Sequence, residues 1–158
     1  MKRLLLLRHA EAESASDHCK DFDRPLSERG RAEALAAAHC IAGTGLEIDA
    51  ALISPALRTR QTIELIAGTL QIGRLTYESA LYLGGADLLL QSVLRCEERF
   101  STVLVVGHNP GISELAQHLS VHDRPLSLRT AGLCRIELPQ HCWSELDVAS
   151  ATAVAVLR

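Results

Sequence analysis

Apolar runs and segments of helical periodicity alternate along this chain. Residues 3–7, 49–53 and 102–106 are short apolar runs, as expected of strands that are buried on both faces of a sheet. Residues 128–138 and 151–157 are expected to form the closing strands. Strands that alternate with helices are typical of an α/β fold in which helices cover the sheet.

Four segments between these runs have the spacing of an amphipathic helix. The first is expected from the N-cap residue Ser27 to residue 41. Ser54 and Pro55 provide an N-cap and a first helical position for the second helix, the third is expected over 87–99, and the fourth follows the third strand. The residues expected to face inward are Leu35, Ala38 and Ile41 in the first helix, Ile63, Ile66, Ala67 and Leu70 in the second, Leu90, Val93 and Leu94 in the third, and Ile112, Leu115, Ala116 and Leu119 in the fourth.

The composition is that of a globular protein. The chain has 158 residues, of which 47% are hydrophobic and 22% charged, and it contains no repeat or linker-like tract. We therefore expect a single domain over residues 1–158. Its predicted architecture is a three-layer α/β/α sandwich with a mostly parallel central sheet.

Charge and cysteine content exclude several classes of function. A formal net charge of −3 gives no broad basic field, so neither nucleic acid nor a membrane is an expected partner. The leucine run at 4–7 is too short for a secretory signal or a membrane span, which predicts a cytoplasmic protein. The five cysteines are odd in number and form no C-x-x-C pair, which argues against a disulfide framework and a common zinc site.

Cationic and titratable side chains follow three of the predicted strands. Arg8 and His9 end the first strand, Arg58 lies in the first turn of the helix after the second, and His108 follows the third. Ligands of open α/β sheets bind beyond the carboxyl ends of the strands, so these four residues are expected to meet in one crevice. Two guanidinium groups beside helix N-termini predict an anion site that suits a tetrahedral phosphoryl group.

Four stretches of the sequence resemble the histidine phosphatase superfamily. They are "LLLLRHAEAE", "DFDRPLSERGRAEA", "ISPALRTRQT" and "VVGHNPGISELA", in the order and at the intervals of the family's motifs. The usual R-H-G of the family is Arg8-His9-Ala10 here, and the short chain is most similar to the SixA-type phosphohistidine phosphatases. The resemblance implies a phosphoglycerate mutase-like fold.

The resemblance also implies roles for individual residues. His9 is expected to be the nucleophile, and Arg8, Arg58 and His108 are expected to hold the phosphoryl group, with Asn109 beside them in substrate binding. The family needs no metal or other cofactor, and the chemistry agrees, because cations such as the two arginines and a protonated His108 can stabilise a phosphoryl group that is transferred. Glu78 lies in the interval that holds a general acid in larger members of the family. An imidazole can leave without a proton whereas an alkoxide cannot, so this role is left open.

The expected function is metal-independent hydrolysis of phosphohistidine in a protein through a phospho-His9 intermediate, which releases free phosphate. Two alternatives remain at this stage. One is a broad phosphomonoesterase that acts on small phosphate esters, and the other is a non-catalytic module that binds phosphate or a phosphoprotein. The acidic residues between the first strand and first helix are interpreted as a solvated loop, with a role in choosing basic or protein substrates as the alternative. These residues are Glu11, Glu13, Asp17 and Asp21.

Overall fold

The computed structural model describes residues 1–16, 18–120 and 125–158, whose strands form one six-stranded sheet with the order β3-β2-β4-β1-β5-β6. The first four strands of the chain are parallel, β5 is antiparallel to β1, and β6 is antiparallel to β5. The predicted mostly parallel sheet is therefore confirmed. The strands are β1 (Lys2–Arg8), β2 (Ile48–Ile53), β3 (Ile72–Tyr77), β4 (Thr102–Gly107), β5 (Leu133–Leu138) and β6 (Ala153–Val156).

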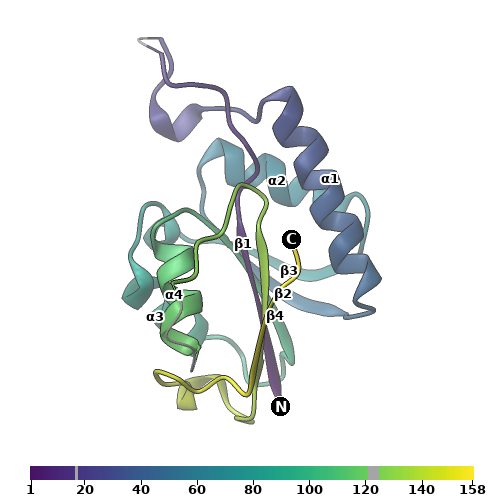
Figure 1. Cartoon of the computed structure of the whole chain (residues 1–158), viewed down its shortest axis with the longest axis vertical. Helices are drawn as coiled ribbons and strands as arrows, with labels where there is room; N and C mark the ends of the chain where they lie inside the picture. Colours follow the sequence, from purple (N-terminus) through teal and green to yellow (C-terminus); the bar gives the residue numbers. More distant parts are fainter. Residues whose placement is uncertain (17, 121–124) are drawn as a thin grey trace.

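Four helices cover the two faces of the sheet, as Figure 1 shows. Helices α1 (Glu28–Gly43) and α2 (Leu57–Ala67) contact each other on one side, and α3 (Ala86–Leu94) and α4 (Gly111–Leu119) contact each other on the other side. The predicted three-layer sandwich is thus confirmed. Within the described ranges, none of the helices has the length and apolar character needed to cross a membrane.

The leucine run of β1 serves both layers of the core. Leu5 and Leu7 lie in the cluster that contains the buried residues of α1 and α2, whereas Leu4 and Leu6 lie in the cluster that contains those of α3 and α4. All four side chains are fully buried. Successive side chains of a strand point to opposite faces, so an uninterrupted apolar run is what a central strand between two helical layers requires.

Helix α1 begins as predicted but buries a different face. The Ser27 hydroxyl accepts a hydrogen bond from the backbone N–H of Gly30 at 3.0 Å, which confirms Ser27 as the N-cap. Leu35, however, is 41% exposed, so its predicted place in the core is wrong. The residues buried along this helix are Gly30, Ala34, Ala37, Ala38 and Ile41. Most of the residues on this buried face are glycine or alanine. These are less hydrophobic than leucine, so the sequence pattern favours Leu35 over them.

Several boundaries also differ from the sequence prediction. Helix α2 begins at Leu57, because the backbone N–H of Ser54 still bonds across the sheet to the carbonyl of Val106 at 3.1 Å. Its inward stripe is confirmed at Ile63 and Ile66, but Ala67 is exposed. Leu70 lies beyond the end of α2, helix α3 ends at residue 94 rather than 99, and the strand expected over 128–138 begins at 133. In α4 all four predicted core residues are fully buried.

The sequence pattern does not predict β3, which is the edge strand beside β2. Four of its six residues are exposed, so it lacks the apolar alternation on which strand prediction depends. Gly73 allows its close approach to β2, since a Cβ at this position would lie 2.3 Å from the carbonyl oxygen of Asp49. The pairing of this strand is thus fixed by a tertiary contact.

Candidate active site

The four residues predicted to converge lie at the carboxyl edge of the parallel strands. Arg8 ends β1 and His9 follows it, Arg58 lies in the first turn of α2, and His108 follows β4. The ring centroids of His9 and His108 are 5.1 Å apart. Burial lowers the pKa of both imidazoles, and the positive charge of the nearby Arg58 lowers both further. These residues therefore surround one site, although they are separated by up to a hundred residues in the chain.

The backbone and ring of His9 are both held in place. Its backbone N–H donates to the carbonyl of Gly107 at 3.0 Å, and its own carbonyl accepts from the N–H of Ala131 at 3.0 Å. The ring Nδ1 lies 2.7 Å from the carbonyl oxygen of Ala10. A carbonyl only accepts, so Nδ1 carries the proton and the Nε2 lone pair is free. Ala10 itself is fully buried in the core beside α1 and α2, where its methyl group packs.

His108 is held from the opposite side of the site. Its Nε2 lies 2.7 Å from the hydroxyl oxygen of Ser54, the residue that follows β2. Burial is the largest cause that lowers the pKa of His9 to about 4 and of His108 to about 3, and nearby positive charges lower both further. Both imidazoles are therefore neutral in the ligand-free protein near neutral pH. The protonated His108 expected from the sequence concerns the protein with a phosphoryl group bound, and it stays a prediction.

Arg8 and Asn109 are bound to the same loop. The Arg8 Nη1 and the Asn109 Nδ2 both donate to the carbonyl oxygen of Leu128, at 3.1 Å and 2.8 Å. The Asn109 side-chain oxygen accepts from the Ser113 hydroxyl at 2.6 Å, and that hydroxyl accepts from the N–H of Leu128 at 2.9 Å. Asn109 thus lies beside the site, with both ends of its amide bonded to the protein. Its role in substrate binding stays a prediction.

Three buried nitrogen atoms of the site have no hydrogen-bond partner within the described residues. They are the Nε atoms of Arg8 and Arg58 and the Nδ1 atom of His108. Unpaired buried donors are costly, and native proteins seldom leave them without a purpose. A cluster of such donors beside His9 fits a site that binds an anion with several acceptor oxygens.

Sequence reasoning missed Asp21 and Tyr82 as part of this site. The Asp21 carboxylate lies 3.1 Å from Arg58 Nη2 and accepts a hydrogen bond from the Tyr82 hydroxyl at 2.8 Å. The edge of the Tyr82 ring contacts His108, with centroids 5.7 Å apart. Asp21 is exposed, as expected of the solvated acidic loop, but its carboxylate also contacts residues of the site. Its place in the "DFDRPL" motif, three residues before Arg24, is the one signal in the sequence that could have indicated it.

Glu78 follows β3 and pairs with a residue outside the four-residue cluster. Its carboxylate lies 3.7 Å from Arg95 Nη2, which is its only ion pair among the residues that the structure covers. Its backbone N–H bonds to the carbonyl of Ile53 at 2.9 Å, at the same edge of the sheet as the site. A role for Glu78 as a general acid stays a prediction.

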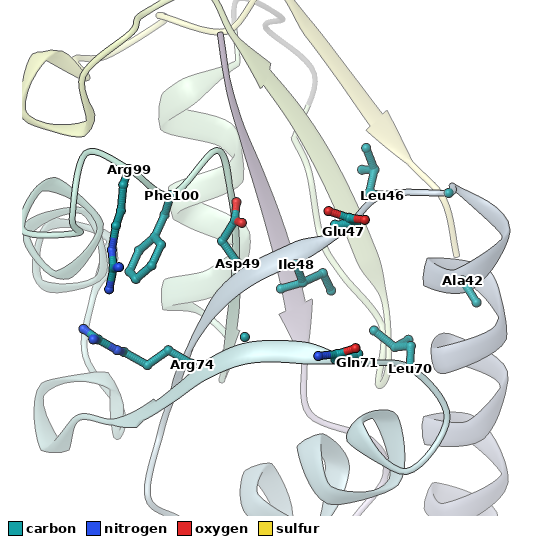
Figure 2. Close-up of a pocket in the computed structure, with 12 residues that line it drawn as sticks. Ala42, Leu46, Glu47, Ile48, Asp49, Leu70, Gln71, Arg74, Arg99 and Phe100 are labelled. Carbon is teal, nitrogen blue, oxygen red and sulfur yellow. The ribbon is translucent and has the colours of Figure 1, made fainter.

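The described residues hold no group of three or more His, Cys, Asp or Glu side chains that could bind a metal. A hollow of about 920 Å³ lies away from these four residues, at the amino ends of β2 and β3. Figure 2 shows Arg74 and Arg99 there near the Phe100 ring, with Asp49 on β2 and Glu47 just before it. None of the four clustered residues lines this hollow. Asp17 of the acidic loop lies outside the described residues, as does His122, a histidine without a partner pattern in the sequence that would indicate catalysis.

Comparison with known proteins assigns the family. The profile of the histidine phosphatase superfamily (branch 1) matches residues 4–81. A solved structure titled as the putative phosphohistidine phosphatase SixA of Nakamurella multipartitia is 30% identical, with a TM-score of 0.80, over 98% of this chain and 95% of that one. The chain belongs to the histidine phosphatase superfamily.

Two further proteins are similar to this chain over most of its length. An uncharacterised protein of Mycobacterium tuberculosis is 31% identical over 94% of this chain and 96% of its own. The phosphohistidine phosphatase SixA of Escherichia coli is 27% identical over 87% of this chain and 86% of its own. Membership of the superfamily and these SixA-like neighbours support phosphatase activity for the chain.

Proposed function

We propose that this protein hydrolyses phosphohistidine in a protein through a phospho-His9 intermediate. The observation that carries the proposal is the hydrogen bond from His9 Nδ1 to the Ala10 carbonyl, beside the three unpaired nitrogen atoms of the site. This bond leaves the Nε2 lone pair free for attack on phosphorus. The low pKa of His9, about 4, keeps that lone pair available at neutral pH.

Two displacements at phosphorus complete the reaction. His9 Nε2 forms a bond to phosphorus while the bond to the substrate imidazole breaks, and the imidazole leaves with its electron pair. Water then attacks phosphorus, the bond to Nε2 breaks, and phosphate leaves with the oxygen of that water. Arg8 and Arg58 stay charged throughout and stabilise the three equatorial oxygens in both steps.

His108 is proposed to donate a hydrogen bond from its Nδ1–H to an oxygen of the phosphoryl group. The Ser54 hydroxyl can donate to His108 Nε2, and this arrangement places the ring proton on Nδ1, the buried atom without a partner. A bound dianion raises the pKa of a neighbouring imidazole, so His108 gains positive charge as the substrate binds. In this proposal His108 carries a positive charge only while the phosphoryl group is bound.

Phosphohistidine is favoured over a phosphate ester by the position of Glu78. Its carboxylate pairs with Arg95, and a site without a fixed general acid suits an imidazole, which leaves without a proton more readily than an alkoxide does. The SixA-like relatives, which are named as phosphohistidine phosphatases, support the same substrate. A broad phosphomonoesterase and a binding module are the alternatives that the assay below separates.

The test is replacement of the nucleophile. His9→Ala is expected to lower turnover of a phosphohistidine peptide by at least about a thousandfold, because the covalent step is lost. Orthovanadate binding, measured by calorimetry, is expected to persist in part through Arg8, Arg58 and His108. The wild-type protein is expected to show acid-labile, base-stable phosphate labelling, which His9→Ala lacks. His39→Ala, which changes an exposed position of α1, is the matched control and should keep full activity.

Three outcomes would overturn the proposal. Near-normal turnover by His9→Ala would exclude a phospho-His9 intermediate. A wild-type kcat/KM that is higher for alkyl phosphates than for phosphohistidine would assign the protein as a phosphomonoesterase. Tight binding of orthovanadate without turnover of either substrate would assign it as a binding module.

A further inference from the structure

Asp21 contacts both terminal nitrogens of Arg58. The Arg58 Nη1 donates to the Asp21 backbone carbonyl at 2.6 Å, and the Nη2 donates to its carboxylate Oδ2 at 3.1 Å. We propose that Asp21 is a positioning residue that fixes the Arg58 guanidinium for phosphoryl transfer, an inference that rests on the proposed function. It assigns a role in the reaction to the 3-10 turn Asp21–Asp23.

The pattern of bonds leaves one edge of the guanidinium for the substrate. Asp21 accepts from one N–H of Nη1 and one N–H of Nη2, whereas the buried Nε of Arg58 has no partner within the described residues. A guanidinium offers its donors in a rigid fork, so fixing two nitrogens also fixes the direction of the third. Arginine is otherwise a long side chain with considerable rotamer freedom, and Asp21 removes that freedom before the substrate binds.

Asp21 is itself fixed by two further residues. Its Oδ1 accepts from Arg24 Nη1 at 2.9 Å, and its Oδ2 accepts from the Tyr82 hydroxyl at 2.8 Å. Arg24 also donates through Nε to the carbonyl of Glu13 at 2.7 Å. The turn is therefore bound to the site by a network of charged side chains, even though the Asp21 side chain is 44% exposed.

Two other roles for Asp21 fit the contacts less well. A general acid must hold a proton, but hydrogen bonds from Tyr82, Arg24 and Arg58 lower the pKa of Asp21 to about 2 against the effect of burial. An internal anion that competes with the substrate would occupy the edge that the phosphoryl group needs. Asp21 instead leaves Nε unpaired, so the two can bind Arg58 together.

The test compares variants of the same turn. Asp21→Ala is expected to lower kcat about tenfold or more, since small displacements of a group that stabilises the transition state are costly. Asp21→Asn keeps an oxygen acceptor for Arg58 and should recover part of that loss. KM should change little, because loss of a neighbouring negative charge favours anion binding and offsets the less ordered Arg58. Asp23→Asn is the control, since its exposed carboxylate has no hydrogen bond or ion pair in the described part of the chain.

Measuring kcat with 4-nitrophenyl phosphate as well as the phosphohistidine peptide separates this inference from the proposed substrate. If only the aryl phosphate is hydrolysed, the proposed substrate fails, and the kcat of the Asp21 variants on that ester still decides the role of Asp21. If neither is hydrolysed, orthovanadate affinity decides it. About tenfold weaker binding is expected for Asp21→Ala, because orthovanadate resembles the transition state rather than the bound substrate and so depends on the position of Arg58. A kcat equal to or above that of the wild type, or unchanged or tighter orthovanadate binding, would overturn the inference.

Discussion

At the scale of single residues, Asp21 and Glu78 are two carboxylates with different contacts. Asp21 is an ion-pair partner of Arg58 inside the site, whereas Glu78 pairs with Arg95 outside the cluster of four. Both are acidic residues between regular strands and α-helices, so residue type alone does not distinguish them. Their partners give them different expected effects on the reaction.

Glu78→Gln is expected to change kcat/KM for a phosphohistidine peptide by less than about threefold. A loss, if it occurs, should be larger for an alkyl phosphate, because only the departing alkoxide needs a proton. Steady-state assays of both substrates with both proteins provide the measurement. Glu97→Gln is the control, since Glu97 forms ion pairs with Arg74 and Arg99 away from the site. An equal and large loss on both substrates would show that Glu78 is not a leaving-group acid.

At the scale of elements, the start of α1 is tied to the loop that follows the nucleophile. The Ser27 hydroxyl accepts from Gly30 N–H and donates to the Glu11 carboxylate at 2.8 Å. The N–H of Ser27 bonds to the carbonyl of Glu11 at 3.0 Å, and a Cβ at Gly30 would lie 1.9 Å from that same carbonyl oxygen. The cap thus stabilises the helix and holds the chain two residues after His9.

Ser27→Ala is expected to lower the free energy of unfolding by about 1 kcal/mol, the usual cost of losing a side-chain cap. Urea unfolding followed by circular dichroism measures this difference. Ser14→Ala, at an exposed position of the preceding loop, is the control and should leave the free energy within about 0.5 kcal/mol. Equal stability of Ser27→Ala and the wild type would mean that the cap contributes nothing.

At the scale of the whole molecule, His9 and His108 are expected to lower the free energy of unfolding at acidic pH. The pKa values of His9 and His108, about 4 and about 3, lie below the 6.5 of an unfolded chain. Below pH 6.5 the unfolded state therefore binds protons that the folded state does not, and stability falls as the pH falls towards these values. Each histidine contributes up to about 1.4 kcal/mol per pH unit in that interval.

His108→Gln removes one of these two groups. Between pH 6 and pH 4 its free energy of unfolding should fall less steeply than that of the wild type, by up to about 1.4 kcal/mol per pH unit. Urea unfolding at several pH values measures the slope, and His39→Gln on the exposed face of α1 serves as the control. Identical slopes for wild type and His108→Gln would contradict the lowered pKa.

The sequence by itself determined the central strands and the amphipathic face of α4. These elements are buried along regular positions, and hydrophobic periodicity records burial directly. It also indicated that Arg8, His9, Arg58 and His108 meet, because each lies at or shortly after the carboxyl end of a parallel strand and these ends share one edge of the sheet. Only the tertiary structure decided the pairing of the polar edge strand β3, which has too few apolar positions to be seen. It alone decided the tautomer of His9 and the partners of Arg58 as well, since the hydrogen bonds of Asp21 and Tyr82 join distant segments and leave no periodic trace in the chain.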